Sequence, residues 1–385
     1  MKAMKIVHCA YFKTLRLRGC FWAGMAYKLN NGLTRLGHQT VCYNDREAAR
    51  ALALFGTKTP WSVRKTNDNF YHYCLDFRPD AIILGHADII TAETLLKIRD
   101  KVPGVKILQW NVDCINPYTD WGEHNIGNIK SKLDAVDFSL ITTADRKLLR
   151  QFDPIRHNVG FIPNPVDKGI EDGQTFANPA PMYDLLFAAS PVKLREFGGK
   201  MAYGREIAEF LQRRAPENRF LFPRISSPML NGTVYFDTLK QAAGVLNLSL
   251  SNHDYLYSSD RMAHAMGNGC LTYIDRHTGF GDLFGEDEAG FFSSAEELIE
   301  QSKDSENFPQ NGQKPQNAAG GIIMPCLTKR RLRGMLPPCS AGTSTRRIIR
   351  FRRCCRQKPG QQKPGHKLRT HFFNITFHFP ETGLI

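Results

Sequence analysis

The sequence predicts an α/β protein with two doubly wound domains that face a cleft. Three observations lead to this fold class. Short apolar segments alternate with amphipathic segments over residues 1–308, one extended connection interrupts the alternation, and the alternation then restarts. Alternating strands and helices are typical of a parallel sheet covered on both faces. Ligands of such folds bind at the carboxyl ends of the strands, against helix N-termini.

The first half, residues 1–160, predicts one such domain. IVHCAYF (6–12) has the composition of a buried strand, and a helical segment near 22–36 follows it. Asp45 is a helix start signal for the next helical segment. The other predicted elements are the strands 39–44, 81–85, 105–113 and 138–144 and the helices 45–55 and 91–102.

A Pro-containing segment, FIPNPVD (161–167), ends this pattern. Each proline biases the residue before it away from helix, so we expect an extended interdomain linker over 161–182. A second domain over 183–305 repeats the alternation. Its predicted strands are 183–190, 219–225, 245–251 and 270–275, and its predicted helices are 204–214 and 259–268; the segment 284–292 and a helix over 294–301 close the domain.

The charge is unevenly distributed along the chain. A net charge of +14 would ordinarily indicate an anionic partner such as nucleic acid or a membrane surface. However, residues 309–385 hold 15 of the 51 Lys and Arg but one acid, Glu381, so residues 1–308 hold 36 charges of each sign. The basic character therefore belongs to the last fifth of the chain.

Cysteine spacing and hydropathy indicate a cytoplasmic protein. None of the ten cysteines shows the two-residue spacing of zinc or redox motifs, so we interpret them as reduced thiols. The N-terminus does not resemble a signal peptide, and no apolar run approaches the ~20 residues of a membrane helix.

The segment LNLSLSNHDYLYSSDRMAHAMGNGCLTYID (246–275) predicts a phosphate site. A strand leads into a polar loop, and Ser258, Ser259 or Asp260 can cap the helix that begins there. Unpaired N–H groups and the helix dipole both favour an anion at such a start, and Arg261 would add positive charge. An ordinary capped surface helix is the alternative interpretation.

The pattern S-x-x-R…A-M-x-x-G-C-L-x-x-x-D, followed by GDLFGEDEAGFF and AEEL, resembles the donor-binding half of GT-B glycosyltransferases. The spore-maturation-type group, similar to families 1 and 4, matches best. FIPNPVD resembles its linker, and MKIVHCAYF…LNNGLTRLGHQTVCYN resembles its first βαβ unit, so the resemblance spans residues 4–305. It implies two Rossmann-like domains, an acceptor-side domain over 1–160 and a nucleotide-sugar-binding domain over 183–305.

The resemblance also implies site residues. Ser258 and Arg261 match the family's Ser and Arg before its helix, with Asp260 between them as a further donor-binding candidate. Gly269 matches the small-residue turn beneath the nucleotide. His264 stands where the family often has a Glu that contacts the donor's ribose; histidine can also form such a hydrogen bond, and a structural histidine is the alternative.

Other strand ends complete the predicted site. Lys193 and Arg195, in AASPVKLREFGGK, are placed to neutralise a diphosphate leaving group, with solvated loop charges as the alternative. Gly19 and Gly24 flank the loop after the first strand, where backbone can approach a ligand closely. Asp113, in QWNVDC, is the candidate catalytic residue at a strand's carboxyl end. No metal motif is present, and no cofactor is expected.

The predicted activity is hexosyl transfer from a nucleotide-sugar to a glycan, lipid-linked or protein acceptor, in surface or envelope polysaccharide synthesis. Two alternatives stay open: a binding or inactivated protein of the same fold, favoured by His264 and the altered tail, and a nucleic-acid-binding protein, favoured by the tail alone. We expect no nucleic-acid partner, and peripheral membrane association stays open.

The tail 306–385 departs from the resemblance. It is Pro-rich and basic, which is typical of a disordered arm that binds polyanions. The family should instead continue with a helix and then a Tyr-His pair. The codons of residues 320–325, read two bases later, permit Trp or Arg, Asp or Asn, Tyr, His and then Ala. We therefore hypothesise a frameshift between residues 300 and 311 that replaced the final helix and impaired activity.

Overall fold

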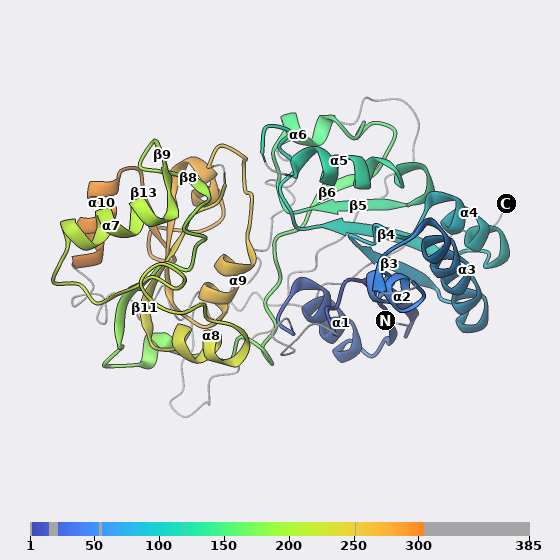
Figure 1. Cartoon of the computed structure of the whole chain (residues 1–385), viewed down its shortest axis with the longest axis horizontal. Helices are drawn as coiled ribbons and strands as arrows, with labels where there is room; N and C mark the ends of the chain where they lie inside the picture. Colours follow the sequence, from blue (N-terminus) through green and yellow to red (C-terminus); the bar gives the residue numbers. More distant parts are fainter. Residues whose placement is uncertain (1, 15–21, 54–55, 120, 251, 304–385) are drawn as a thin grey trace, which may run out of the picture.

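The computed structural model describes residues 2–14, 22–53, 56–119, 121–250 and 252–303. Within these ranges the chain forms two α/β units, each built around a parallel sheet, as Figure 1 shows. The fold class predicted from the alternation of strands and helices is therefore confirmed. Gly19 and the tail 306–385 lie outside the described residues.

The first unit contains a six-stranded sheet in the order β2-β1-β3-β4-β5-β6, with every neighbouring pair parallel. The chain runs from β1 to β2 on one side and returns to β3 on the other. The strand order therefore reverses between β1 and β3, which is where doubly wound sheets hold their ligands. The strands are β1 Lys5–Ala10, β2 Gln39–Tyr43, β3 Ala81–Gly85, β4 Lys106–Asn111, β5 Phe138–Ile141 and β6 Val159–Phe161.

Helices cover both faces of this sheet because its strands are apolar on both faces. In β1, Val7 packs into one core cluster with Phe70 of α3, whereas Ile6 packs into another with Leu29 of α1. The helices are α1 Met25–Arg35, α2 Asp45–Ala51, α3 Pro60–Phe77, α4 Ala92–Lys101, α5 Gly122–Lys130 and α6 Arg146–Arg150.

The sequence prediction missed helix α3. Three of its five buried side chains, Ser62, Thr66 and Asn67, are polar, and only Phe70 and Cys74 are apolar. The stripe that faces the sheet therefore gives a weak hydrophobic period. Thr59 and Ser62 form a capping box that starts the helix.

The second unit contains a five-stranded parallel sheet in the order β10-β7-β11-β12-β13. Its strands are β7 Tyr183–Leu186, β10 Phe220–Leu221, β11 Ala242–Asn247, β12 Leu271–Asp275 and β13 Gly290–Phe292. Its helices are α7 Gly204–Arg214, α8 Gly232–Leu239, α9 Asp260–Gly267 and α10 Ala295–Lys303. Among the described helices of both units, none is long and apolar enough to cross a membrane.

An antiparallel hairpin that the sequence analysis treated as a loop precedes α7. Strands β8 Leu194–Phe197 and β9 Lys200–Tyr203 are joined by Gly198 and Gly199, both with positive φ. A two-residue turn with positive φ at both positions matches the twist of antiparallel strands, and glycine adopts it without strain.

The two units contact each other along the linker and at the ends of β5. Asn31 and Arg35 of α1 donate to Asp167, and Lys28 pairs with Glu171 at 2.5 Å. At the end of β5, the backbone N–H of Ser258 donates to the carbonyl of Thr142 at 3.0 Å. These contacts set α9 on the side of the second unit that faces the first, as Figure 1 shows.

Candidate active site

Two guanidinium groups meet at the carboxyl end of β11. Arg195, in β8, is only 5% exposed and donates from Nη1 to the carbonyl oxygen of Leu248 at 2.7 Å. Arg261, in the first turn of α9, donates from Nη2 to the same oxygen at 2.9 Å and from Nη1 to the carbonyl of Ala188 at 3.0 Å. Both predicted basic residues are therefore brought together.

The two positively charged guanidinium groups of Arg195 and Arg261 lie close together. Among the described residues, neither guanidinium donates a hydrogen bond to a carboxylate, and Arg195 Nε is buried without a partner. Burial lowers the pKa of Arg195, and the charge of Arg261 lowers that pKa further. A buried and a half-buried cation whose hydrogen-bond acceptors are neutral carbonyls are costly until an anion joins them. Planar guanidinium groups bind phosphate in a bidentate manner, so this arrangement suits a phosphate group.

The N-terminus of α9 lies beside these guanidinium groups and faces the first unit. Ser259 is the N-cap; its Oγ accepts from the N–H of Met262 and donates to Asn247 Oδ1 at 2.8 Å. Burial raises the pKa of Asp260, the next residue, and the charges of Lys28, Lys13, Asp113 and Arg261 act on it as well. Three of those four charges belong to the first unit, so the start of α9 lies in the space between the units.

His264 lies one turn further along α9 and points toward the first unit. Its Nε2 is 3.4 Å from the carbonyl oxygen of Ala23 and 3.7 Å from Glu171 Oε1, and its ring packs against Phe236 at a centroid distance of 5.0 Å. Burial lowers the pKa of His264 well below its ordinary value, and the charge of Lys28 adds to this effect. The imidazole is therefore neutral at pH 7. The ribose contact expected of His264 stays a prediction.

Two of the expected site residues have structural duties. Ser258 is 3% exposed, and its Oγ accepts hydrogen bonds from the backbone N–H and Nδ2 of Asn164, at 2.8 and 3.0 Å. This oxygen ties the linker to the segment that precedes α9, and the direct donor contact expected of Ser258 stays a prediction. Gly269 has φ +76°, and a Cβ there would lie 2.7 Å from the ring of Phe176. Glycine is thus required by the turn after α9 and its packing.

The remaining expected residues lie around the same space or outside the description. Lys193 is half-buried directly before β8, and its carbonyl accepts from the N–H of Gly204. Gly24 is the N-cap of α1 with an extended backbone, so its conformation does not require glycine. Asp113 follows β4, and its charge raises the pKa of Asp260 in the second unit.

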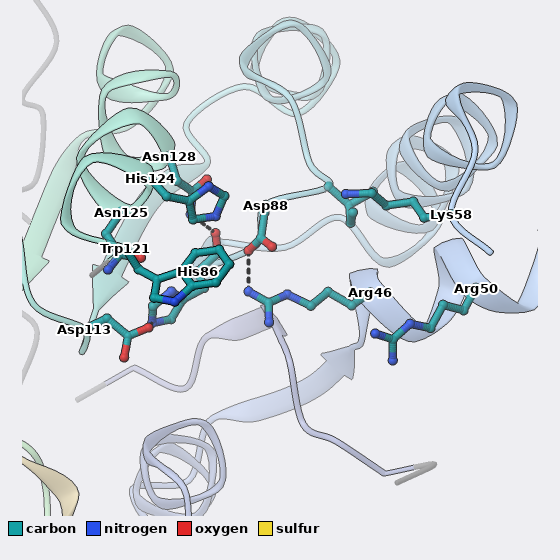
Figure 2. Close-up of a pocket in the computed structure, with 11 residues that line it drawn as sticks. Arg46, Arg50, Lys58, His86, Asp88, Asp113, Trp121, His124, Asn125 and Asn128 are labelled. Carbon is teal, nitrogen blue, oxygen red and sulfur yellow. Dashed lines mark hydrogen bonds and ion pairs between the residues drawn. The ribbon is translucent and has the colours of Figure 1, made fainter. Parts of the chain in front are cut away.

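A pocket of about 590 Å³ lies at the carboxyl ends of β3 and β4, on the first unit. Asp113 is on its lining with a side chain 62% exposed, and its Oδ2 is 3.7 Å from His86 Nε2. Figure 2 shows the lining residues, which include His86 and the charged residues Arg46, Arg50, Lys58, Asp88 and Asp113.

The loop after β3 shapes this pocket through a strained backbone. His86 and Ala87 both have positive φ, 61° and 26°, which is unfavourable for residues other than glycine and is typical of functional sites. His86 Nε2 accepts from the N–H of Val112 at 3.4 Å, and Asn128 Nδ2 donates to the His86 carbonyl at 2.6 Å. Burial lowers the pKa of His86, which keeps its imidazole neutral.

Sequence reasoning missed the pocket residues other than Asp113. One available signal was position, because His86 and Asp88 directly follow a predicted buried strand, as Asp113 does. Arg46, Arg50 and Lys58 carried no such signal, since they lie on or beside helices. Within the described ranges, no group of three or more His, Cys, Asp or Glu side chains could hold a metal ion.

Comparison with known proteins places the fold. No protein-family model and no curated protein matches the sequence. Sucrose-phosphate synthase from Thermosynechococcus elongatus has a similar structure, with a TM-score of 0.53 at 10% identity over 86% of this chain and 94% of that one. HepE of Anabaena in complex with UDP-glucose has a TM-score of 0.46 at 12% identity, over 86% and 99% of the two chains. The chain therefore has the GT-B fold, with two Rossmann-like domains.

Proposed function

We propose that this protein is a glycosyltransferase that moves a sugar from a nucleotide-sugar donor to an acceptor. The observation that carries the proposal is the pair of guanidinium groups of Arg195 and Arg261, which share the Leu248 carbonyl beside the start of α9. The sequence pattern around Arg261 and the fold shared with a sucrose-phosphate synthase support the same activity. We also propose that the reaction serves surface or envelope glycan synthesis, that it takes place in the cytoplasm, and that it needs no cofactor.

The proposed chemistry depends on charge at the leaving group. When the bond between the sugar and the diphosphate breaks, negative charge grows on the departing oxygen. Arg195, Arg261 and the positive end of the α9 dipole stabilise this charge more in the transition state than in the bound donor. Both guanidinium groups are held by backbone carbonyls, so they need little rearrangement during the reaction.

We assign the acceptor hydroxyl to Asp113. Its carboxylate is exposed at the carboxyl end of β4. Its negative charge raises the pKa of Asp260 and of Tyr257, both in the second unit. In this arrangement the carboxylate accepts a hydrogen bond from the acceptor hydroxyl while the donor lies on the α9 side. Lys193, Asp260 and His264 are proposed to line the donor side.

Donor binding is tested by thermal unfolding in the presence of UDP-, GDP-, ADP- and TDP-sugars. A ligand that binds only the folded state at 100 times its Kd stabilises it by about 2.7 kcal/mol. We expect one nucleotide class to raise the Tm and to be hydrolysed or transferred by the wild type. Arg261→Gln should weaken this shift, whereas Arg213→Gln, on the exposed face of α7, should leave it unchanged. If no nucleotide raises the Tm, the proposed donor site is wrong.

We also propose that the tail arose from a frameshift. This proposal follows from the codon argument for residues 320–325 and from the charge imbalance after residue 308. DNA sequencing tests it directly: the alternative frame should encode a helix followed by Tyr-His. A chain with that frame restored should be more stable and at least as active, and an alternative frame without the helix refutes the idea.

A further inference from the structure

The pocket of the first unit lies at the point where the strand order of its sheet reverses. The loop after β3 forms one wall, and the loop after β1 lies beside it, because Arg46 stacks its guanidinium on the ring of Tyr11 at 4.9 Å. Asp113, assigned above to the acceptor, lines the same pocket. The pocket is therefore continuous with the proposed reaction site.

One side of this pocket is cationic. Figure 2 shows Arg46, Arg50 and Lys58 together on the α2 side, opposite His86 and Asn128. Arg46 Nη2 donates to Asp88 Oδ1 at 2.7 Å, and this hydrogen bond keeps the pKa of Asp88 below its ordinary value although burial acts to raise it. Arg46 is therefore a fixed and already neutralised part of the wall.

Arg50 and Lys58 are different. Among the residues that the structure describes, no side chain or carbonyl pairs with either of them, although both line the pocket. Arg50 lies in the last turn of α2, and Lys58 directly precedes the Thr59 cap of α3, so the backbone of both residues is held by or next to regular structure. Within the described part of the chain, Arg50 and Lys58 are thus two unpaired cations on one side of the pocket, and the Asp113 carboxylate lies on the other side.

The opposite side offers neutral polar groups beside the Asp113 carboxylate. The His86 imidazole is neutral because burial lowers its pKa, and Asn128 is held by Lys132, whose Nζ donates to Asn128 Oδ1 at 2.5 Å. Trp121, 72% exposed at the start of α5, adds a flat apolar surface to the lining. An aromatic face with neutral polar groups suits a sugar ring, whereas the cations on the other side suit a negative substituent.

We infer that this pocket binds an acceptor sugar that carries an acidic group, a phosphate or a carboxylate, held by Arg50 and Lys58. The inference rests on the proposed function, since the ligand is the acceptor. Arg46 positions the acid through its remaining N–H groups, and the sugar ring lies toward Trp121 and Asp113. The volume of about 590 Å³ accommodates a monosaccharide with such a substituent.

The test compares three ligands of similar shape: glucose, glucose 6-phosphate and glucuronic acid. Binding to the full chain is measured by titration calorimetry at fixed ionic strength. The two acids should bind at least tenfold more tightly than glucose. Each charged contact removed costs about tenfold in affinity, so Arg50→Gln/Lys58→Gln should weaken acid binding by about 100-fold. The control Arg64→Gln/Lys65→Gln removes two exposed charges of α3 that do not line the pocket, and should bind like the wild type.

The outcomes of this test distinguish a phosphate from a carboxylate on the acceptor. They also distinguish failure of the acceptor pocket from failure of the donor site. Tighter binding of glucose 6-phosphate alone assigns a phosphate, and tighter binding of glucuronic acid alone assigns a carboxylate. Equal binding of glucose and both acids, no binding of any of the three, or an unchanged affinity in the double variant overturns the inference. The nucleotide-induced Tm shift, measured on the same variants, should not change, so failure of the donor site would be visible separately.

Discussion

Replacing Lys28 with Met tests how the first unit is held to the linker that leads to the second unit. Lys28 Nζ lies 2.5 Å from Glu171 Oε1, neither side chain has any exposed surface, and Nζ also donates to the Pro165 carbonyl at 3.1 Å. The variant leaves the Glu171 carboxylate buried with a neutral His264 at 3.7 Å. Removing one partner of a buried pair costs about 3–5 kcal/mol, so we expect the free energy of unfolding to fall by about that amount.

The loss should depend on pH. Burial raises the pKa of Glu171, and the charge and hydrogen bond of Lys28 oppose that rise. Without Lys28, the folded-state pKa rises further above the ordinary value of 4.5. The folded state then binds more protons than the unfolded state within this window, so stability falls as pH increases through it. The effect of Lys28→Met should be smallest near pH 4.5 and largest at neutral pH.

The assay is urea unfolding, followed by circular dichroism at pH 5 and pH 7.5. The double variant Lys28→Met/Glu171→Gln should recover most of the stability, because no buried charge remains. Lys97→Met, which breaks the exposed pair with Glu93 on α4, serves as the control and should unfold like the wild type. If the free energy of unfolding falls by less than about 1 kcal/mol, or falls equally at both pH values, the buried Lys28–Glu171 pair does not have the stabilising role proposed for it.

Three further predictions concern the proposed site. Arg261→Gln should lower kcat/KM by about 10²–10³ because a cation at the leaving group is lost, and Arg261→Lys should restore part of the activity. Equal activity of the wild type and the Gln variant would contradict a role of Arg261 at the leaving group. Asp113→Asn should lower kcat by at least about 10² with an unchanged nucleotide Kd, and a change confined to nucleotide binding would move Asp113 to the donor side. Gly269→Ala should destabilise the protein by about 2–4 kcal/mol in urea, since alanine meets positive φ and the Phe176 ring; a neutral substitution would show that the turn relaxes.

Local patterns predicted most of the sheet. The segments at 81–85 and 270–275 are strands within a residue of the prediction, because continuous apolar runs leave few alternatives. The hairpin of β8 and β9 was missed although Gly198-Gly199 signals it, since the apolar side chains Leu194, Met201 and Tyr203 face solvent and give no core pattern. Side chains at such exposed positions are selected by contacts that a sequence period does not reveal.

Local patterns indicated single residues of the candidate site but not the contacts between them. Arg195 and Arg261 could be singled out individually from their places after a strand and at a helix start. Their convergence on the Leu248 carbonyl depends on the packing of the hairpin against β11, which no local pattern encodes. For Ser258, the donor contact predicted from its position stays a prediction, and the structure adds hydrogen bonds from the linker residue Asn164 to its Oγ, which no local pattern indicates.

The sequence by itself determined the fold class, the order of most strands and helices, and the region of the second unit that carries buried positive charge. These features follow from hydrophobic period and capping, which act over a few residues. The tertiary structure alone decided which charges stay unpaired and which are neutralised. Arg46 forms an ion pair with Asp88, and Lys28 forms one with Glu171. Arg50 and Lys58 form no ion pair with any residue that the structure describes. Parallel strands bring residues far apart in sequence to one edge of a sheet, so the pairing of charges there depends on the packing of the whole fold.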